Sequence, residues 1–408
     1  MSILSQITPN QQERLEFKRI TAEFLKLLNG KLTDARAVLG GSGAKDTWLA
    51  GNHDIDVFVL FDYKKFHLKS NELSDFLEKK LQRAFPSANL SRVHGSRDYF
   101  QMHYGNFFFE IIPILKISKA EQAVNITDVS LLHAKWVNAK AKKLKDEIRL
   151  AKQFCRAQQV YGAESYIGGF SGYVLEILIV NYGSFNKLLQ ASAQWKNKEV
   201  VDVEHHYRGK DALFEINSSK HSPLVVIDPV DKSRNAAAAL TMEKISLFKK
   251  KAVQYLKKPG DSFFIKQEMS IDSWKQKYPQ QIVLQVQVLE ISGKRDVVGS
   301  KLLKAFVFLC DKLKQFGLID AGWEWNQFYF VLKQQELDEF TERVGPPLKM
   351  KEDVLNFKKK NKETYLKGGK IFAKVKIKNR QLDLVLKDLI KEPYFKEKVK
   401  EVKDWKIV

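Results

Sequence analysis

The sequence predicts a multidomain protein of mixed α/β and α+β structure, on three observations. Its 408 residues correspond to two to four domains at ~100 to 200 residues each. Hydrophobic residues make up 44% of the chain and prolines number only 10, so there is enough apolar side chain for folded cores. Apolar residues recur with the period of two typical of strands in some segments and with helical spacing in others.

The N-terminal elements begin with a helix predicted over residues 9–29, because Thr8 starts a T-x-x-Q capping pattern with proline at the first helical position. A short strand over residues 36–39 leads into a glycine-rich turn at 40–43. A short helix is predicted after the turn, over residues 44–49.

The most clearly patterned strand covers residues 53–62, HDIDVFVLFD, where β-branched and aromatic residues alternate with a period of two. Residues 70–85 return to helical spacing, and two strands are predicted within residues 98–114, on either side of a Tyr-Gly-Asn turn. We therefore expect an N-terminal domain over residues 1–133 with a small mixed sheet and helices.

A long basic amphipathic helix is predicted over residues 134–160, and the following segment is mostly helical up to residue 257, which defines a middle domain over residues 134–257. Lysine, proline and glycine mark a boundary after it. The last domain, residues 258–408, is expected to contain small α/β modules. Its main predicted elements are strands over 282–290, 328–333 and 370–377 and a helix over 301–316.

The charge predicts a polyanionic partner, because 69 basic residues against 48 acidic ones give a net charge of +21. Residues 1–130 hold 17 basic and 15 acidic side chains, so the excess lies downstream. Residues 349–378 alone hold eleven lysines against three acidic residues, interleaved with aromatic rings. Such a segment suits an RNA backbone with exposed bases; the alternative is a solubilising surface.

The two cysteines, Cys155 and Cys310, provide neither a disulfide framework nor a four-ligand zinc site. The N-terminus lacks the basic and apolar regions of a signal peptide, and no stretch reaches the ~18 apolar residues of a membrane span. These features predict a soluble, cytoplasmic protein.

Two carboxylates in the best-defined strand are candidates for metal binding. Asp54 and Asp56 are separated by one residue, so the pleat places both on the same face of the sheet. Carboxylates in this arrangement can clamp two divalent cations for phosphoryl transfer. Taken alone, a D-x-D pair is more often a pair of surface acids or caps.

The glycine-rich turn before that strand is a candidate phosphate site. Gly40-Gly41-Ser42 ends a strand and begins a helix, which presents backbone N–H groups and a hydroxyl, and Lys45 adds a positive charge. The alternative is an ordinary tight turn. A third acid, Glu110, interrupts an apolar strand and could complete the metal ligands; its alternative role is to protect an edge strand from aggregation.

Together these residues resemble a known family. The segment GGSGAKDTWLAGNHDIDVFVLF is similar to the signature of the DNA polymerase β nucleotidyltransferase superfamily, and specifically to archaeal (class I) CCA-adding enzymes, the tRNA nucleotidyltransferases. The resemblance covers nearly the whole chain, most strongly up to about residue 265. Further blocks that carry it are HAKW at 133–136, VYGAESYIGGFSGYVLEILIVNYGSF at 160–185, IDPVDKSRNAAAAL at 227–240 and RVGPP at 343–347.

The resemblance implies a polymerase-β-like catalytic head over residues 1–133, a neck over 134–257 that completes the nucleotide site, and a tRNA-binding body and tail over 258–408. It implies that Asp54, Asp56 and Glu110 are catalytic metal ligands, although aspartate is common at the third position. The implied nucleotide-binding residues are Ser42, Lys45, His133, Lys152, Tyr161 and Arg234, the last of which would face the incoming base.

Taken in their own sequence context, these residues could also have roles outside a nucleotide site. His133 could be a satisfied, partly buried imidazole, Lys152 part of a solvated charged face, and Tyr161 a packing residue at a helix end. Arg234 could form a surface salt bridge.

The implied function is addition of C, C and A to the 3′ end of tRNA from CTP and ATP, with Mg²⁺ and release of pyrophosphate, by a two-metal mechanism. The implied RNA partner is the acceptor and T-arm half of tRNA, and the family is often dimeric. Two alternatives stay open at this stage: a related poly(A) or oligo(A) polymerase, and a non-catalytic RNA-binding protein on the same fold.

Overall fold

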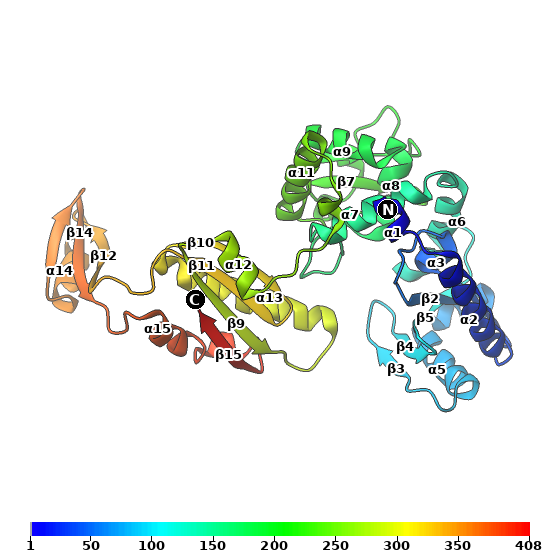
Figure 1. The fold of residues 1–408 in the computed structure, drawn as a ribbon, viewed down its shortest axis with the longest axis horizontal. Coiled ribbons are helices and arrows are strands. Elements are labelled where there is room, and N and C mark those ends of the chain that lie inside the picture. The colour runs from blue at the N-terminus through cyan, green and yellow to red at the C-terminus, as the bar shows by residue number, and fades with distance from the viewer. Residues whose placement is uncertain (1) are drawn as a thin grey trace. The chain divides into compact units, whose positions relative to one another are not determined.

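The computed structural model describes residues 2–408 and divides the chain into two compact units, Met1–Gln267 and Glu268–Val408. Both mix helices with β-sheet (Figure 1), so the predicted class, mixed α/β and α+β, is confirmed. The predicted division of the first unit into two domains, at residues 133 and 134, stays a proposal.

The first unit is built on a five-stranded sheet with the order β1-β2-β5-β4-β3. The central strands β2 and β5 are parallel, and the other neighbours are antiparallel. The period-two patterns thus predicted the central strands correctly. The strands are β1 (Ala35–Leu39), β2 (Asp54–Phe61), β3 (Ser91–Val93), β4 (Tyr99–Tyr104) and β5 (Phe107–Leu115).

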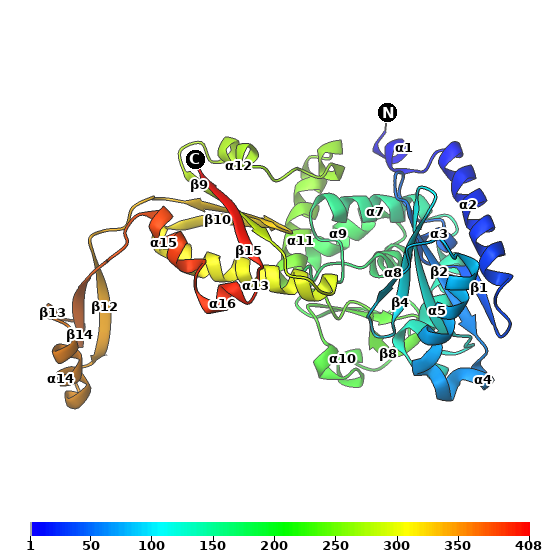
Figure 2. The same ribbon diagram turned by 90° about the horizontal axis from the view of Figure 1, so that it is seen from below.

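Two helices, α2 (Gln11–Asn29) and α5 (Leu73–Ala84), contribute to the same core as one face of this sheet (Figure 2). The buried Phe24 of α2 stacks on Phe109 of β5 with ring centroids 4.0 Å apart. Ile55 and Val57 of β2 point into this core, so the alternate residues Asp54 and Asp56 point to the opposite face. This alternation fixes which face of β2 carries Asp54 and Asp56.

Two predicted helix starts near the N-terminus are wrong. Helix α2 is capped by Asn10, which forms a capping box with Glu13, while Thr8 follows a separate short helix, α1 (Ile3–Ile7). Asn10 was overlooked because Thr8 and Pro9 offered a competing start signal two residues earlier.

The short helix predicted over residues 44–49 is instead α3 (Gly41–Lys45). It begins within the glycines because the Ala44 N–H donates to the Gly40 carbonyl, and it ends where Asp46 adopts a left-handed conformation. The glycine-rich turn is therefore itself the start of the helix, and Ser42 lies in its first turn.

The rest of the first unit is mainly helical, as predicted, with a small sheet in the order β6-β7-β8. Its helices are α6 (Ser130–Lys140), α7 (Lys145–Ala157), α8 (Gly172–Tyr182), α9 (Phe185–Gln194), α10 (Ala212–Glu215) and α11 (Met242–Lys257). Its strands are β6 (Glu199–Val201), β7 (Leu224–Asp228) and β8 (Asp231–Asn235).

The single long helix predicted over residues 134–160 is wrong, because it is two helices, α6 and α7. The chain leaves helical geometry at Ala141, which is buried, and α7 starts afresh with Asp146 and Glu147 in its first turn. Acidic side chains stabilise a helix N-terminus, so they mark a start inside a segment that reads as uniformly basic.

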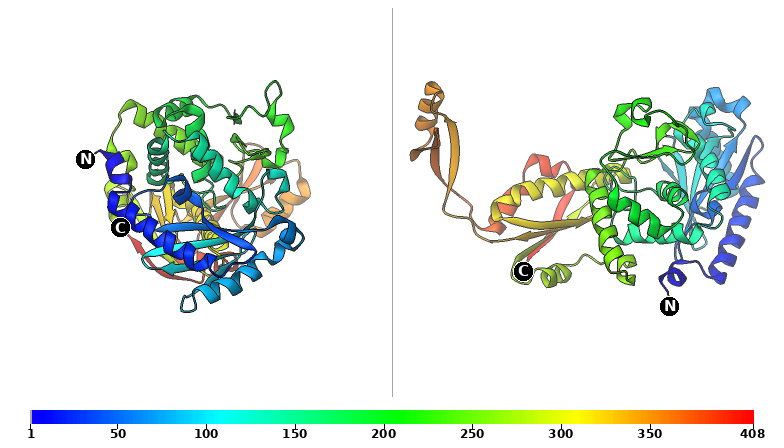
Figure 3. Two further views of the ribbon diagram at one scale, coloured as in Figure 1. Left: turned by 90° about the vertical axis from the view of Figure 1, so that its right-hand side faces the viewer. Right: turned by 90° about the horizontal axis from the view of Figure 1, so that it is seen from above.

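The second unit contains two antiparallel sheets, with the orders β10-β11-β9-β15 and β12-β14-β13. Figure 3 draws the ribbon of this unit in the colours from yellow-green to red. Helix α13 and the C-terminal helices pack on one face of the larger sheet. The strands and helix predicted here are confirmed with shifted ends. The elements are α12 (Ile271–Lys277), β9 (Ile282–Leu289), α13 (Arg295–Leu313), β10 (Leu318–Glu324), β11 (Gln327–Leu332), β12 (Phe340–Pro347), α14 (Lys351–Lys360), β13 (Thr364–Lys367), β14 (Lys370–Lys376), α15 (Leu382–Leu389), α16 (Pro393–Lys396) and β15 (Glu401–Ile407).

Short 3₁₀ helices connect several of these elements. They are η1 (His67–Glu72), η2 (Ala120–Gln122), η3 (Ile126–Val129), η4 (Ser218–Lys220), η5 (Asp261–Phe264) and η6 (Lys314–Phe316). None of the helices formed by residues 2–408 has both the length and the apolar character that a membrane crossing requires.

Candidate active site

The three candidate carboxylates lie on the two parallel central strands of the first unit. Asp56 of β2 and Glu110 of β5 are directly opposed in the strand register, and Asp54 lies two residues before Asp56 on the same face. The parallel pairing brings together acids that are 54 positions apart in the sequence, as the sequence analysis expected of a neighbouring strand.

Each of these carboxylates makes the ionised form of its neighbours less favourable. Burial and, next, the charge of Glu110 raise the pKa of Asp56 to about 6. Burial also raises the pKa of Glu110, although Gln101 on β4 donates a hydrogen bond to it at 2.6 Å. Because none of the ion pairs found among residues 2–408 involves these acids, the face carries a concentration of negative charge that a cation would relieve.

The donor chemistry of this face fits a hard divalent cation such as Mg²⁺, which binds one or two carboxylates together with substrate phosphate oxygens. Across residues 2–408, no three histidine, cysteine, aspartate or glutamate side chains are gathered closely enough to enclose an ion by themselves. The protein therefore offers part of a coordination shell, which phosphates and water would complete.

The glycine-rich turn lies directly against Asp56. The Gly40 N–H donates to the Asp56 carbonyl at 2.7 Å, which fixes the turn on strand β2. Gly41 has φ of +51° and its missing side chain leaves the space that the Asp56 carboxylate occupies. Ser42 is half-buried in the following turn of α3. The turn is thus adjacent to the carboxylates in space as well as in sequence.

Lys45 and Lys152 meet at one buried carboxylate, Glu176 of α8. Lys45 Nζ lies 2.6 Å from Glu176 Oε2 and Lys152 Nζ lies 2.8 Å from Glu176 Oε1. Lys152 is 4% exposed. The alternative interpretation, that Lys152 belongs to a solvated charged face, is therefore wrong. Both ammonium groups also lower the pKa of Asp56, so they lie near the carboxylate face.

His133 and Arg234 meet at a second buried carboxylate, Asp228, at the end of β7. His133 Nε2 and Arg234 Nη1 lie 3.0 and 2.5 Å from Asp228 Oδ2. Tyr173 OH donates to the other carboxylate oxygen at 3.0 Å, and its ring stacks on His133 with centroids 4.1 Å apart. Burial alone would raise the pKa of Asp228, but the His133 hydrogen bond and the two cationic partners hold it at about 2.

Tyr173 links these two groups, because Lys45 Nζ lies 6.0 Å from the centroid of its ring. Tyr161 also approaches Lys152: a Cβ built on Gly172 would stand 2.9 Å from Tyr161 OH and 3.4 Å from Lys152 Cε. The structure thus gathers five of the six nucleotide-binding candidates into a connected set of side chains, and Ser42 lies on the same short helix as Lys45.

Sequence reasoning missed Glu176, Asp228, Tyr173 and Gln101. Glu176 could have been found by the argument applied to Glu110, because it is a lone acid in the apolar run VLEILIV. The partners of Asp228 are up to 95 residues away in the sequence, so no local pattern points to it.

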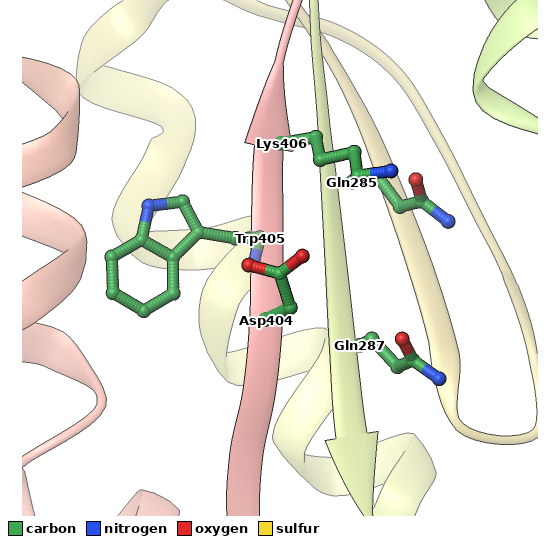
Figure 4. A pocket seen from close by; sticks show the side chains of 5 residues that line it. All are labelled: Gln285, Gln287, Asp404, Trp405 and Lys406. Atoms are coloured by element: carbon green, nitrogen blue, oxygen red, sulfur yellow. The ribbon is translucent and has the colours of Figure 1, made fainter.

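The second unit has a small pocket of its own, lined by Gln285, Gln287, Asp404, Trp405 and Lys406 (Figure 4). Its volume is about 80 Å³, whereas small-molecule sites usually need at least ~300 Å³. This pocket does not qualify as a nucleotide site, and every candidate described above belongs to the first unit.

Two family descriptions match the first unit. The family model described as a nucleotidyltransferase domain matches residues 18–97, which include Ser42, Lys45, Asp54 and Asp56. The one described as the second domain of tRNA nucleotidyltransferase matches residues 146–265, which include Lys152, Tyr161, Glu176, Asp228 and Arg234.

Similarity to curated proteins extends along nearly the whole chain. The CCA-adding enzyme of Nanoarchaeum equitans is 31% identical over 374 residues, which cover 90% of this chain and 91% of that protein. The CCA-adding enzyme of Thermococcus gammatolerans is 28% identical, and the alignment covers 95% of this chain and 88% of that protein. The CCA-adding enzyme of Sulfolobus acidocaldarius is also 28% identical, with 94% of this chain and 89% of that protein covered.

Among solved structures, a poly(U) polymerase is similar in fold with a TM-score of 0.53 at 14% identity, covering 65% of this chain and 97% of that one. A cytoplasmic RNA terminal U-transferase gives a TM-score of 0.50, also at 14% identity, with the same coverage. At this identity the similarity concerns the fold alone.

Proposed function

The chain belongs to the family of CCA-adding enzymes and is a tRNA nucleotidyltransferase that adds CCA to tRNA 3′ ends; we propose how its residues carry out that reaction. The observation that carries the proposal is the opposition of Asp56 and Glu110 across β2 and β5, beside the glycine turn and two ammonium groups. This arrangement places metal-binding acids next to groups suited to phosphates.

Asp54, Asp56 and Glu110 would hold the divalent metal ions that nucleotidyltransferases use, and we propose Mg²⁺. Bound there, Mg²⁺ supplies Lewis acidity that polarises phosphate oxygens and lowers the pKa of a coordinated hydroxyl. Glu110 positions the 3′ hydroxyl of the tRNA primer, and its raised pKa suits a carboxylate that accepts a proton from that hydroxyl.

The nucleotide would lie with its triphosphate at Ser42, Lys45, Lys152 and Tyr161. The two ammonium groups would stabilise the negative charge that develops on the departing pyrophosphate. His133 and Arg234 would contact the nucleoside, with Arg234 toward the base, because both are held at Asp228 and Tyr173 connects that carboxylate to Lys45.

For tRNA we propose that residues 258–408 form the body and tail that contact the acceptor and T-arm half. All four lysines of the run Lys358–Lys360 and Lys362 are exposed, which leaves them available to phosphates. The head and neck would be residues 1–133 and 134–257. A homodimer, from the resemblance to the family, and a cytoplasmic location, from the sequence features described above, are further proposals.

The test is incorporation of radiolabelled CTP and ATP, with Mg²⁺, into tRNA transcripts that end at the discriminator base, at C or at CC, followed by sequencing of the products. We expect C, C and A in order and then termination. A homopolymer tail would favour a poly(A)-type or poly(U)-type polymerase instead. RNA binding without incorporation would favour a non-catalytic RNA-binding protein.

A further inference from the structure

Glu176 is a buried acid at the point where the two candidate phosphate-binding lysines meet. Its side chain has no exposed surface, and each carboxylate oxygen contacts a different ammonium group, Lys45 Nζ at 2.6 Å and Lys152 Nζ at 2.8 Å. We propose that Glu176 is a positioning residue that holds Lys45 and Lys152 side by side, both charged, for the triphosphate of CTP or ATP. This inference rests on the proposed nucleotide site.

The geometry requires such a bridge. Lys45 comes from α3 and Lys152 from α7, and two ammonium groups brought together without an anion repel one another. Thr47 completes the arrangement, because its hydroxyl donates to Glu176 Oε1 at 2.8 Å and accepts from Lys152 Nζ at 2.8 Å. A closed triangle of Glu176, Lys152 and Thr47 therefore fixes the lysine relative to the segment that follows the glycine turn.

The charges of Lys45, Lys152 and Glu176 do not cancel. Glu176 neutralises only one of the two ammonium groups; the candidate metal-binding acids also lie near them, so once a divalent cation offsets the charge of those acids, the second ammonium group would be left for an anionic triphosphate. A purely structural buried ion pair would need a single cation. Arg156 adds further positive charge near Lys152 and Tyr161.

The protonation of Lys152 provides a measurable signal of this role. Burial first, and then the charges of Lys45 and Arg156, lower the pKa of Lys152 to about 8, while Glu176 acts in the opposite direction. Asp56 on β2 also interacts with Lys152, and Tyr161 and Tyr173 interact with Glu176. Removing the Glu176 charge would lower the pKa of Lys152 further, so this lysine would lose its proton at a lower pH.

The experiment compares the full-length wild type with Glu176→Gln, which keeps the size of the side chain and removes its charge. The KM for CTP and for ATP is measured between pH 6 and pH 9. We expect both KM values at pH 7.5 to rise about tenfold or more, with the KM for tRNA changed less than about twofold. We also expect the nucleotide KM of the wild type to rise as pH passes through about 8, where Lys152 loses its proton, and this rise to occur at lower pH in the variant.

Glu147→Gln is the matched control. Glu147 is a half-buried acid on α7 whose carboxylate accepts from the Phe185 backbone N–H at 2.7 Å instead of contacting the two lysines. Its substitution should leave the nucleotide KM and its pH dependence unchanged. If Glu176→Gln behaves in the same way while the wild type adds CCA, the inference is overturned and the proposed function stands.

Glu176→Asp provides a second test that keeps the charge. Aspartate is shorter by one methylene, so its carboxylate cannot keep both contacts, and we expect nucleotide KM values above those of the wild type and below those of Glu176→Gln. Should Glu176→Gln not fold, the aspartate variant decides: an unchanged nucleotide KM refutes the positioning role. An inactive wild type would instead refute the proposed function.

Discussion

The carboxylate of Asp56 occupies the place where a side chain on Gly41 would lie: a Cβ built on Gly41 would stand 1.5 Å from Asp56 Oδ2. Gly41 also has φ of +51°, a conformation that side chains with a Cβ rarely adopt. The glycine turn and strand β2 are therefore complementary in shape at a single contact. Residue 41 must therefore be glycine for two reasons, the backbone geometry of the turn and the contact with Asp56.

Gly41→Ala should lower CTP and ATP incorporation at least ~100-fold, because the new methyl group displaces the Asp56 carboxylate from its position. Gly51→Ala is the control, because Gly51 has φ of +70° and open space around its missing side chain. It should cost only the backbone strain, about 1 to 2 kcal/mol of stability, and leave incorporation nearly intact. Equal activity losses in the two variants would show that strain, and not the contact with Asp56, is responsible.

Asp54→Ala and Asp56→Ala should each abolish incorporation of both C and A, because the proposed metal-binding face would lose a ligand. Binding of tRNA should stay nearly unchanged, since its affinity arises mainly from the basic segments downstream. Asp62→Ala is a suitable control: this residue follows the same strand and is exposed, with its carboxylate capping the short helix α4 (Tyr63–Phe66). Substantial residual activity in either catalytic variant would refute the assignment.

Mg²⁺ should raise the melting temperature more at pH 8 than at pH 5. In the metal-free protein, burial and the charge of Glu110 raise the pKa of Asp56 from 3.8 to about 6. The folded state thus binds this proton more tightly than the unfolded state does, so the associated stability is present below about pH 4 and is lost as pH rises through about 6. At pH 8 the ionised carboxylate is available to the cation, whereas at pH 5 a proton competes for it.

Thermal unfolding of the wild type and of Asp56→Asn, with and without MgCl₂ at both pH values, measures this effect. The variant should show a small Mg²⁺ effect that is similar at the two pH values. A wild-type increase of the same size at pH 5 and pH 8 would contradict the assignment of Asp56 as a ligand.

Replacing Lys358, Lys359, Lys360 and Lys362 together with alanine should weaken tRNA binding. The slope of log affinity against log salt should become shallower by up to ~0.7 to 0.9 for each phosphate contact that is lost. The control replaces four exposed lysines of the first unit, so that the net charge changes equally. These are Lys18, Lys64, Lys69 and Lys79. An unchanged slope in the first variant would identify that run as solvated surface.

The local sequence patterns predicted the parts of the site that depend on short-range geometry. The alternation in β2 placed Asp54 and Asp56 on one face, and the lone acid in β5 indicated Glu110. Lys152 could be assigned only through the resemblance, because its burial depends on the packing of α7 against α8, and its own helix reads as a charged surface. The α6–α7 break was missed for a different reason: Asp146 and Glu147 mark the start of α7, but they lie within a segment that reads as uniformly basic.

The contacts of the connecting carboxylates could not be predicted in this way. Glu176 and Asp228 contact side chains that are 131 and 95 residues away in the sequence, so only the folded chain shows what they hold. A surface arginine and a base-facing arginine also look alike in sequence. The ion pair of Arg234 with a fully buried aspartate distinguishes it from an ordinary surface salt bridge, the alternative considered at the outset.

Arg234 and Asp228 lead to the last prediction, on how one pocket accepts C and A without a nucleic-acid template. A guanidinium presents fixed, forked donors that can meet acceptors on cytosine and adenine, whereas uracil and guanine present N–H donors at the corresponding edge. Arg234→Ala should therefore lose discrimination against UTP and GTP by about 1 to 3 kcal/mol. Asp228→Asn should lose part of it while the arginine is still present, because Arg234 Nη1 loses the carboxylate that fixes it at 2.5 Å.

The measurement is kcat/KM for all four nucleotides on tRNA ending at the discriminator base, at C and at CC. Lys232→Ala is the control, because it removes an exposed cation from the same strand, two residues from Arg234. It should leave the preference ratios unchanged, so a loss in the Arg234 and Asp228 variants cannot be ascribed to net charge. If Arg234→Ala keeps the wild-type ratios, Arg234 does not face the base. If Arg234→Ala loses the wild-type ratios but Asp228→Asn keeps them, the arginine selects the nucleotide without the buried carboxylate. Asp228 would then serve to hold His133 and Tyr173 in the fold.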